Sequence, residues 1–376
     1  MNFNFTPEQE AIRSLAREFA DHEIVPNARR YDEEERFPEE VMDRLRDVGL
    51  FNLAIPEQYG GPGIDKISHA LIVEEIARGC AGIATSMEAN SLASYPMLVG
   101  GSEEQKKRFL PRLTEGRQYA SFALTEPGAG SDVRSLRTTA ERAGDHYILN
   151  GEKCFITNAS YADFYVVLAK LKNTDRFVAL VVERESGGLS VGESEKKMGL
   201  RSSNTASIIF EDVSVPVSNR IGEEGEGLKI FMKALSYARP MVGAQSVGVA
   251  RGAYEEALRY AKERRQFGKP IADFQAIQFM LADMAINIEA ARLLVHKAAF
   301  LLDQGILSAS SSSFAKTFAA DTAMKVAADA VQIFGGYGFI REYPVEKYFR
   351  DAKIMQIYEG TNQIQRVVIA KDILTA

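Results

Sequence analysis

The sequence predicts an α+β chain of several domains, in the order helices, antiparallel sheet, long helices. Apolar residues recur at helical spacing in the first third and again after about Gly225, which is typical of helices with one buried face. Between Ala120 and Gly225 the chain has short β-branched or aromatic runs separated by turn residues, which favour strands. No helical stretch separates these runs, so the middle sheet is expected to be mostly antiparallel.

The N-terminal part, residues 1–119, is expected to be an α-helical domain. Its first helix lies in "TPEQEAIRSLAREFADHEIV", where Thr6 and Gln9 have the spacing of a capping box. Ser102 and Gln105 repeat this spacing in "SEEQKKRFLPRL". Both pairs therefore predict the starts of helices.

The middle part, residues 120–225, is expected to be a β domain. Strands are predicted in the runs "DHYILNGEK", "FYVVLAKL", "RFVALVVE" and "ASIIFEDVSV". The pair Asn150 and Gly151 predicts a hairpin turn, because Asn-Gly suits the tight turns that join antiparallel strands.

The last part, residues 226–376, is expected to be helical. From Phe274 to Leu302 the apolar residues alternate steps of three and four, which predicts a sustained seam for helix–helix packing. Near the end, "KIMQIYEGTNQIQR" predicts a helix that stops and restarts. Asn362 and Gln365 have the spacing of the new helix's cap and its return partner.

Glu359 stands at this restart, directly before Gly360. An isolated Glu-Gly pair is usually a surface carboxylate in a turn between helices. Ile354 and Tyr358 crowd the acid from one side, however, which leaves a second interpretation. The carboxyl group could lie in an apolar pocket, with its pKa raised so that it accepts a proton.

Composition excludes several classes of protein. The formal charge of −6 argues against nucleic acid as the main partner, because phosphate binding needs a basic surface. Cys80 and Cys154 imply no disulfide framework, and the four histidines lack the spacing of metal ligands, so no metal is expected. No run approaches the roughly 20 apolar residues of a membrane span. Without an evident signal or transit peptide, a cytoplasmic protein of bacterial type is expected.

Three stretches suit a flat heteroaromatic cofactor. "FALTEPGAGSD" runs from a strand into a loop whose bare amides could meet an anion or a ring, although a flexible turn is equally compatible. "KCFITNAS" adds a second strand end, with Phe155 beside Thr157. "RRQFGKPI" places Arg264 and Phe267 at a helix end, where a pyrophosphate could dock. "FGGYGF" lacks the spacing of a dinucleotide fingerprint, so an ordinary NAD-binding fold is not expected.

Six motifs resemble the acyl-CoA dehydrogenase family over essentially the whole length: "LTEPGAGSD", "FITNA", "ERRQFGKPI", "QIFGGYGF", "EYPVEKYFRDAKI" and "YEGTNQIQR". The resemblance implies an N-terminal helical domain, a middle β domain and a C-terminal four-helix bundle. It also implies an FAD-dependent enzyme, an acyl-CoA substrate and a homotetramer built as a dimer of dimers. Electron-transferring flavoprotein is the implied electron acceptor.

The resemblance also implies which residues bind FAD. Positions matching contacts to the flavin ring are Phe122, Leu124, Thr125, Gly130, Ser131, Phe155, Ile156 and Thr157. Positions matching contacts to the pyrophosphate and adenosine of an FAD held mainly by a neighbouring subunit are Arg264, Gln266, Phe267, Gln275, Gln332, Ile333, Gly335 and Gly336. Thr361 and Gln363 match adenosine-side contacts at a helix start. FAD would then be shared between protomers.

For the chemistry, Glu359 matches the base that removes the α-proton of the acyl thioester while the β-hydrogen leaves as hydride to the flavin. The N–H of the same residue and an FAD ribityl hydroxyl are implied to hold the thioester oxygen. The isovaleryl-type subgroup has its base at the position of Ala238, so that alternative base is absent. Implied substrate contacts are Ser131, Ser236, Arg239, Tyr358 and Gly360, with Ser236 standing where relatives often have Asp.

The stretch "GIATSMEANSLASYPM" matches the helix that closes the far end of the acyl pocket. Glutaryl-type relatives carry an Arg where this chain has Gly82, and residues 81–101 contain no basic side chain. A buried carboxylate without a cation is costly, so a compact, uncharged acyl group of butyryl size, branched or alicyclic, is expected. Glu88 fits either a solvated helix position or a place in the pocket.

Other enzymes and a non-catalytic protein stay as alternatives. They are a dehydrogenase of alicyclic or dicarboxylic acyl-CoA, an oxygen-using oxidase of the same superfamily, and a helical scaffold that has lost catalysis. Acyl-CoA oxidases are usually longer, nitroalkane oxidases carry Asp at the position of Glu359, and a scaffold would lose its base.

Overall fold

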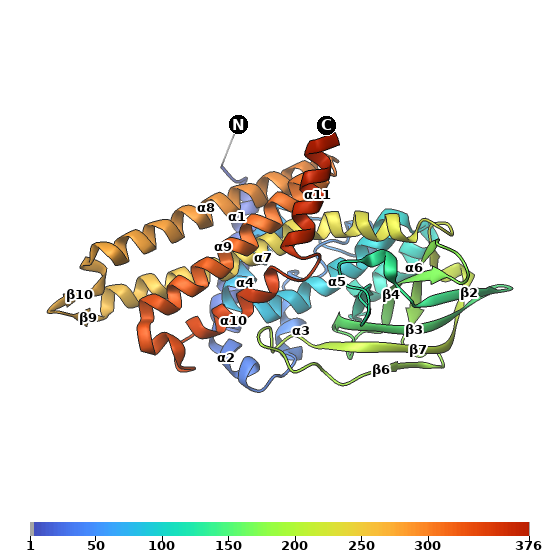
Figure 1. Ribbon diagram of the computed structural model, residues 1–376, viewed down its shortest axis with the longest axis horizontal. Helices are drawn as coiled ribbons and strands as arrows, with labels where there is room; N and C mark the ends of the chain where they lie inside the picture. The colour runs from blue at the N-terminus through green and yellow to red at the C-terminus, as the bar shows by residue number, and fades with distance from the viewer. Residues whose placement is uncertain (1–3, 376) are drawn as a thin grey trace.

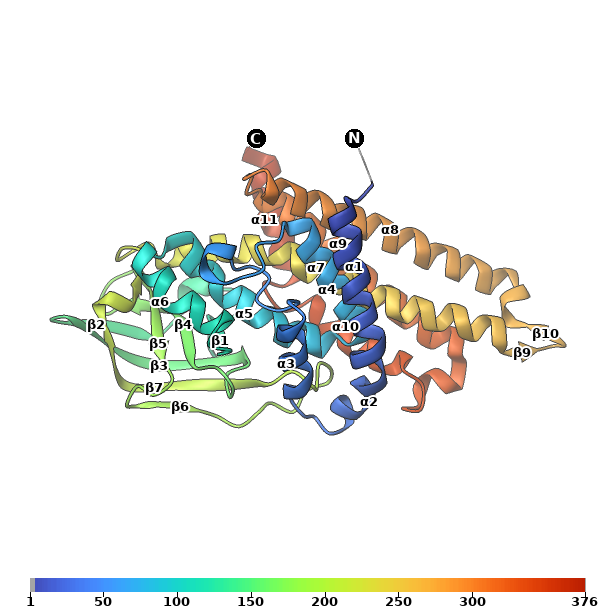
Figure 2. The same cartoon turned by 180° about the vertical axis from the view of Figure 1, so that it is seen from behind.

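The computed structural model describes residues 4–375, and the helical, strand and helical parts follow one another along the chain as the sequence predicts. In Figure 1 the sheet forms one end of an elongated molecule, and the long helices α7, α8 and α9 extend to the other end. Figure 2 shows the N-terminal helices across the middle, in front of the long helices. The middle of the molecule is therefore where all three parts meet.

The N-terminal part is helical and begins with the predicted cap. Thr6 Oγ1 accepts a hydrogen bond from the Gln9 N–H at 3.2 Å, and the Gln9 side chain accepts from the Thr6 N–H at 3.0 Å. Ser102 and Gln105 form the same reciprocal pair, so both predicted capping boxes are confirmed. The helices are α1 (Pro7–Phe19), α2 (Val25–Glu33), α3 (Glu39–Asp47), α4 (Lys66–Gly79), α5 (Ala81–Gly100) and α6 (Glu103–Thr114), with a π-helical turn at Ala20–Ile24.

The strands form one sheet in the order β6-β7-β3-β2-β4-β5-β8, with β1 paired to β4. Most neighbours are antiparallel, as predicted, whereas β1–β4 and β2–β4 are parallel. The strands are β1 (Ala120–Ala123), β2 (Thr139–Ala143), β3 (His146–Thr157), β4 (Phe164–Leu171), β5 (Phe177–Glu183), β6 (Leu189–Val191), β7 (Thr205–Pro216) and β8 (Arg220–Ile221).

Strands β4 and β5 are buried on both faces, which explains their continuous apolar runs. Phe164 and Val166 of β4 pack on one side with Phe109 of α6 and Phe231 of α7. The alternate residues, such as Val167, pack on the other side within the sheet part. The sheet is thereby fixed against the helices that carry the site.

The predicted hairpin at Asn150 and Gly151 is wrong. Both residues lie inside β3, and the turn that joins β2 to β3 falls at Gly144. Gly151 has a φ of 144°, and a β-carbon there would lie 2.6 Å from the Cα of Thr138. The glycine serves a close approach of two backbones at a strand irregularity, which a local dipeptide pattern does not reveal.

The C-terminal part is a bundle of long helices. α7 packs against α4, α5, α8 and α9. Along α8, residues of the predicted seam, including Leu281, Met284, Ile288 and Val295, are buried, so the packing seam is confirmed. The elements are α7 (Gly227–Glu263), β9 (Arg265–Gln266), β10 (Lys269–Pro270), α8 (Gln275–Asp303), α9 (Ala309–Phe334), a 3₁₀ segment (Gly335–Phe339), α10 (Val345–Met355) and α11 (Asn362–Thr375).

A buried network of charges ties the N-terminal helices to the bundle. Arg251 of α7 donates to Glu74 at 2.7 Å and to Glu75 at 2.8 Å, and Arg292 of α8 donates to Glu74 at 3.0 Å. Removing one member would leave its partner charged and buried, which is strongly destabilising. Among residues 4–375, a helix with the length and apolar character to cross a membrane is absent.

Candidate active site

Glu359 lies in the turn between α10 and α11, beside α7 and α9. The residue as a whole is partly buried, but its Oε2 atom is fully buried and has no hydrogen-bond partner among residues 4–375. The group is therefore neither a freely solvated carboxylate nor the acceptor of a direct ion pair.

The surroundings of Glu359 raise the pKa of its carboxyl group. Burial raises its pKa to about 7, the charge of Glu88 adds to this, and the nearby cations Arg239 and Lys316 oppose it. An ordinary glutamate has a pKa of about 4.3. A carboxyl group with this pKa can both accept and release a proton near physiological pH.

The predicted cap of α11 is wrong by one residue. Thr361 is the cap, because its Oγ1 accepts from the N–H of Ile364 at 3.2 Å. Asn362 is buried instead, and its side chain donates to the carbonyl of Thr317 at 3.2 Å. Gln365 does not reach back to the Asn362 N–H; its amide donates to the carbonyls of Glu359 and Gly360.

The loop after β1 and the end of β3 lie side by side, as the predicted flavin contacts require. The N–H of Cys154 donates to the carbonyl of Thr125 at 2.9 Å, and Ser121 Oγ donates to the carbonyl of Thr157 at 2.7 Å. The predicted flavin-ring contacts in these segments are Phe122, Leu124, Thr125, Gly130, Ser131, Phe155, Ile156 and Thr157.

Lys153 and Glu126 were not expected, and they hold this loop in place. Lys153 is fully buried and donates to Glu126 at 2.8 Å and to the Leu124 carbonyl at 3.0 Å. Glu126 also accepts from the N–H groups of Arg137 and Thr138. Because the pair is buried and hydrogen-bonded on both sides, it fixes the path of the loop.

These strand ends offer the groups that a flat, polar ring needs. Phe155 is 65% exposed and has a φ of 57°, so a large aromatic face points outward from a backbone conformation that such residues rarely adopt. Around Gly130 a β-carbon would meet no atom within 4 Å. Ile156, by contrast, is buried. Together, the exposed Phe155 ring and the amides and hydroxyls of the two strand ends fit the isoalloxazine ring of a flavin.

A second group of predicted cofactor contacts lies at the far tip of the bundle. Arg264, Gln266, Ile333, Gly335 and Gly336 line one groove of about 430 Å³. Figure 1 shows this tip, marked by β9 and β10, at the end of the molecule opposite the sheet. Phe267 stands there 93% exposed. Gln332 lies in the last turn of α9 beside this groove and Gln275 begins α8. Thr361 and Gln363 lie instead at the start of α11.

The predicted substrate contacts differ in burial and in the hydrogen bonds that their side chains already make. Arg239 is buried and its Nε donates to the Glu359 carbonyl at 3.4 Å. Tyr358 donates its hydroxyl to Gln245 at 2.7 Å. Ser236 is buried, and its hydroxyl donates to the carbonyl of Met232 on its own helix at 3.0 Å. Ser131, on the exposed loop after β1, and Gly360 complete the set.

Glu88 is paired rather than solvated. His69 of α4 is fully buried, and its Nε2 lies 2.9 Å from Glu88 Oε1. Glu88 is also close enough to Glu359 for its charge to raise the pKa of that residue. Asn90, on the same helix, has a structural role: its Oδ1 accepts from the N–H of Ala120 at 3.0 Å.

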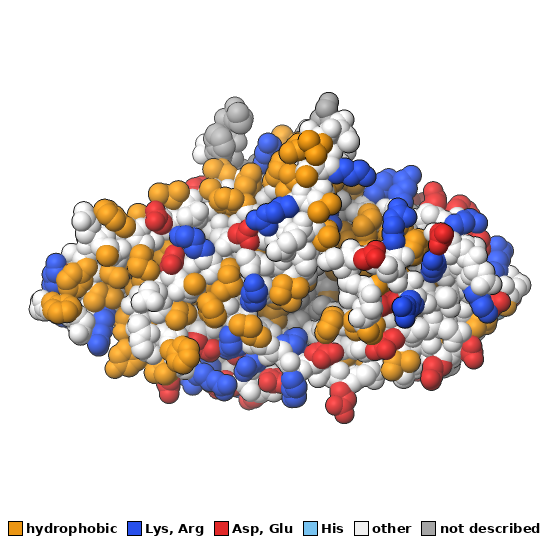
Figure 3. All heavy atoms as spheres, in the orientation of Figure 1, with side chains coloured by type: hydrophobic (Ala, Val, Ile, Leu, Met, Phe, Trp, Pro, Cys, Tyr) orange, Lys and Arg blue, Asp and Glu red, His pale blue; other side chains and the backbone are white. Residues whose placement is uncertain are grey.

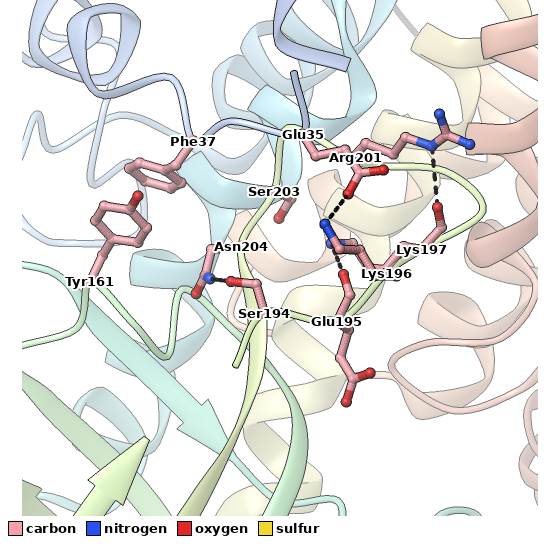
Figure 4. A pocket seen from close by; sticks show the side chains of 10 residues that line it. All are labelled: Glu35, Phe37, Tyr161, Ser194, Glu195, Lys196, Lys197, Arg201, Ser203 and Asn204. Carbon is pink, nitrogen blue, oxygen red and sulfur yellow. Dashed lines mark hydrogen bonds and ion pairs between the residues drawn. The ribbon is translucent and has the colours of Figure 1, made fainter. Parts of the chain in front are cut away.

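A separate polar pocket contains no predicted site residue. Figure 4 shows Lys196 bonded to Glu35, and Phe37 facing Tyr161. The lining residues are Glu35, Phe37, Tyr161, Ser194, Glu195, Lys196, Lys197, Arg201, Ser203 and Asn204. Within the described part of the chain, no group of three or more His, Cys, Asp and Glu residues is arranged to hold a metal ion.

Lys316 and Gln365 were also missed by sequence reasoning. Both are fully buried and both bind the carbonyl of Gly360. The available signal was Lys316 itself, a lone cation in the small and apolar run "ASSSSFAKTFAAD". A charge at such a place on a buried helix is rare without a specific partner.

Comparison with known proteins gives one consistent family. The models of the acyl-CoA dehydrogenase N-terminal, middle and C-terminal domains match residues 6–117, 121–213 and 225–374. A chain from a structural study of the electron-transferring flavoprotein of Acidaminococcus fermentans is 45% identical, with a TM-score of 0.97 and full coverage of both chains.

Two further solved structures are similar over the whole chain. Butyryl-CoA dehydrogenase of Megasphaera elsdenii is 42% identical, with a TM-score of 0.96 and full coverage of both chains. An acyl-CoA dehydrogenase of Bacillus anthracis in complex with FAD is 37% identical, with a TM-score of 0.94 over 99% of this chain and 68% of that one.

Proposed function

Because the chain belongs to the acyl-CoA dehydrogenase family, we propose that it oxidises a small, uncharged acyl-CoA to the enoyl-CoA. In this proposal Glu359 is the base, FAD is the cofactor and an electron-transferring flavoprotein accepts the electrons. The observation that carries the proposal is the buried, unpaired carboxyl oxygen of Glu359, with a pKa raised to about 7.

The backbone at Glu359 suits the second task of the site, which is to hold the thioester oxygen. None of the hydrogen bonds among residues 4–375 uses the N–H of Glu359, since α10 has already ended at Met355, four residues earlier. A free N–H beside the base is a donor for the negative charge that develops on the thioester oxygen when the α-proton leaves. Gly360 adds no β-carbon that would hinder this approach.

FAD, when bound, supplies the hydride acceptor for the β-hydrogen. In this chain the exposed ring of Phe155, the amides around Gly130 and the hydroxyls of Thr125 and Thr157 would hold its flavin ring. Arg264 would bind the pyrophosphate as a fixed cation. The solved Bacillus anthracis relative contains FAD, which supports the same cofactor here.

The groove at the bundle tip, which Arg264 and Gly335 line, supports a shared cofactor and an oligomer. Phe279, Ile286, Leu293 and Phe300 repeat every seven residues along α8 and are 45–65% exposed. Figure 3 shows hydrophobic side chains gathered over this half of the molecule, whereas charged side chains crowd the sheet half. An apolar stripe of this kind marks a protein interface. We assign it to the homotetramer, a dimer of dimers, in which one protomer completes the FAD site of another.

The acyl group is proposed to be compact and uncharged. The negative charge of Glu88 acts on Glu359. A second carboxylate brought in by the substrate would therefore be repelled by a like charge. The nearby His69 ring is already hydrogen-bonded to Glu88. Megasphaera elsdenii butyryl-CoA dehydrogenase, a relative with a short-chain substrate in its name, supports the size.

Mixing purified protein with acyl-CoA thioesters tests the proposal directly. We expect yellow protein whose flavin absorbance bleaches under anaerobic conditions with butyryl-CoA and reoxidises with electron-transferring flavoprotein. Rapid peroxide formation in air would assign the protein to the oxidases instead. Protein that neither binds FAD nor bleaches with any thioester would refute a dehydrogenase and favour a scaffold.

A further inference from the structure

The backbone of the proposed base adopts a conformation that its own residue type disfavours. Glu359 has a φ of 51° and Gly360 a φ of 93°. A residue with a β-carbon rarely takes the left-handed region, and it stays there only when the surroundings fix it. Had α10 continued, the N–H of Glu359 would donate to the carbonyl of Met355, four residues earlier. α10 ends at Met355 instead, which leaves this N–H free, and the φ of Glu359 then sets the direction of its side chain relative to that N–H.

Side chains from three other helices hold the two carbonyls of this turn. The Gln365 amide of α11 donates to the Glu359 carbonyl at 3.2 Å and to the Gly360 carbonyl at 3.0 Å. Lys316 of α9 donates to the Gly360 carbonyl at 3.0 Å. Arg239 of α7 adds a longer contact to the Glu359 carbonyl, at 3.4 Å.

These holding groups are themselves held. The Gln365 carbonyl oxygen accepts from Ser313 Oγ at 2.8 Å, which fixes the direction of its amide. Lys316 also donates to Asn362 Oδ1 at 2.8 Å, and the Asn362 amide donates to Asp321 at 2.7 Å. A chain of buried hydrogen bonds of this kind fixes the geometry at its end.

Lys316 is an expensive residue to bury for packing alone. It is fully buried, and within the described residues no carboxylate lies within ion-pair distance of its ammonium group. Burial lowers its pKa to about 8, with the charges of Glu359, Arg239 and Asp321 around it. A buried cation without a direct counter-ion reduces stability, so its retention calls for another role.

We infer that Lys316 and Gln365 are positioning residues: they lock the left-handed turn at Glu359 so that the carboxyl group and the free N–H face the substrate together. The inference rests on the proposed role of Glu359 as the base. Lys316 has a second effect, because its positive charge stabilises the ionised form of Glu359. The charged groups that face Glu359 are Arg239, Lys316 and Glu88.

Two variants separate the two effects. Gln365→Met keeps the size of the side chain and removes the two bonds to the turn, without changing any charge. We expect kcat per bound flavin to fall between about tenfold and a hundredfold, since misplacement of a catalytic group by 1 Å can cost 10²-fold. KM and the pKa of the acidic limb of the rate profile should change little.

Lys316→Met should lower kcat in the same way and also raise the pKa of the acidic limb, because a cation beside the base is lost. Lys325→Met is the matched control: Lys325 is on the same helix, 55% exposed, and pairs with Asp329. This control should leave kcat, KM and the pH profile unchanged.

Flavin content, thermal unfolding and a crystal structure of Gln365→Met keep the test independent of folding losses. A Glu359 φ outside the left-handed region in that crystal would support the lock. The inference is overturned if Gln365→Met and Lys316→Met keep wild-type kcat per bound flavin, or if Glu359 keeps its φ and Lys316→Met leaves the pH profile unmoved. Failure of the wild type to bleach with any acyl-CoA would refute the proposed function, and the crystal would still decide whether the lock exists.

Discussion

The two ends of the proposed site are built in opposite ways. At Glu359, the backbone carbonyls of the turn are held by buried partners from the same chain, including Lys316 and Gln365. At the bundle tip, Phe267 is 93% exposed and Gly335 faces open space. The first end is complete within one chain, whereas the second offers binding groups without cover. The chemistry is therefore expected to depend on packing within a protomer, and cofactor retention on contact between protomers.

Replacing the base should give the largest effect and should leave the other end intact. Glu359→Gln removes the only group proposed to take the α-proton, and loss of a general base costs about 10²–10⁴-fold. We expect turnover to fall by at least this factor while the protein stays folded, yellow and tetrameric. Steady-state kinetics, flavin absorbance and gel filtration measure these quantities.

Glu193→Gln is a suitable control, since Glu193 is exposed in the sheet part and should keep full activity. A Glu359→Gln enzyme that retained a tenth of the wild-type turnover would remove Glu359 from the role of base.

A charged acyl group should be rejected at the complete end. Glutaryl-CoA would bring a carboxylate towards Glu88, whose hydrogen-bond partner His69 is already engaged. An uncompensated buried charge costs several kcal/mol, so kcat/KM should be at least about a hundredfold lower than for butyryl-CoA. Comparing butyryl-, cyclohexanecarboxyl-, decanoyl- and glutaryl-CoA measures both the charge effect and the preferred size.

Glu88→Gln sharpens this test, because it removes the like charge and should reduce the discrimination against glutaryl-CoA. Equal kcat/KM for glutaryl-CoA and the best neutral substrate would contradict the argument from charge.

The open end should respond to the loss of its cation without loss of the base. Arg264→Ala removes the proposed pyrophosphate contact, and a hydrogen bond to a charged group is worth about 1.5–3 kcal/mol. We expect FAD affinity to fall about tenfold or more, with the tetramer weakened at the same time. Flavin-to-protein absorbance ratios and gel filtration at several concentrations report on both.

Arg259→Ala provides the control for Arg264→Ala. Arg259 lies near the end of α7, which stops just before Arg264, and its side chain is 51% exposed and paired with Glu256 and Glu263. An Arg264→Ala protein with full flavin content in an unchanged tetramer would argue against a cofactor shared between protomers.

The features predicted correctly from the sequence depend on residues close together in the chain. The capping pair Thr6 and Gln9 and the apolar seam of α8 are local patterns, and each fixes one element. The same holds for the order of helices, strands and helices. The domain boundaries at 119/120 and 225/226, in contrast, stay a prediction.

What the sequence missed depends on residues far apart in the chain. Gly151 is explained by the approach of Thr138 rather than by a hairpin, and Lys316 acts on Gly360, 44 residues later. Asn362 is drawn into the core by Asp321, which leaves Thr361 as the cap. Spacing along the chain contains no information about such contacts, because the fold creates them.

The smallest expected effect is a difference in pH dependence between catalysis at Glu359 and cofactor binding at the bundle tip. Burial raises the pKa of Glu359 to about 7. We therefore expect kcat/KM near pH 7 to be half of its value at high pH, and to fall about tenfold for each pH unit below 7. FAD content and assembly should not change between pH 6 and 8, since the proposed pyrophosphate contact does not involve Glu359.

The raised pKa of Glu359 should also make the stability of the folded protein depend on pH. A carboxyl group whose pKa is raised on folding favours the folded state while it is protonated, and this contribution is lost as the pH rises through about 7. Glu359→Gln mimics the neutral form, so its stability relative to the wild type should be greater at pH 8 than at pH 5. Thermal unfolding of both proteins at the two pH values measures the difference. A kcat/KM profile that is flat from pH 5.5 to 8, together with equal pH dependence of unfolding, would show that Glu359 is not the buried, proton-accepting group at the complete end.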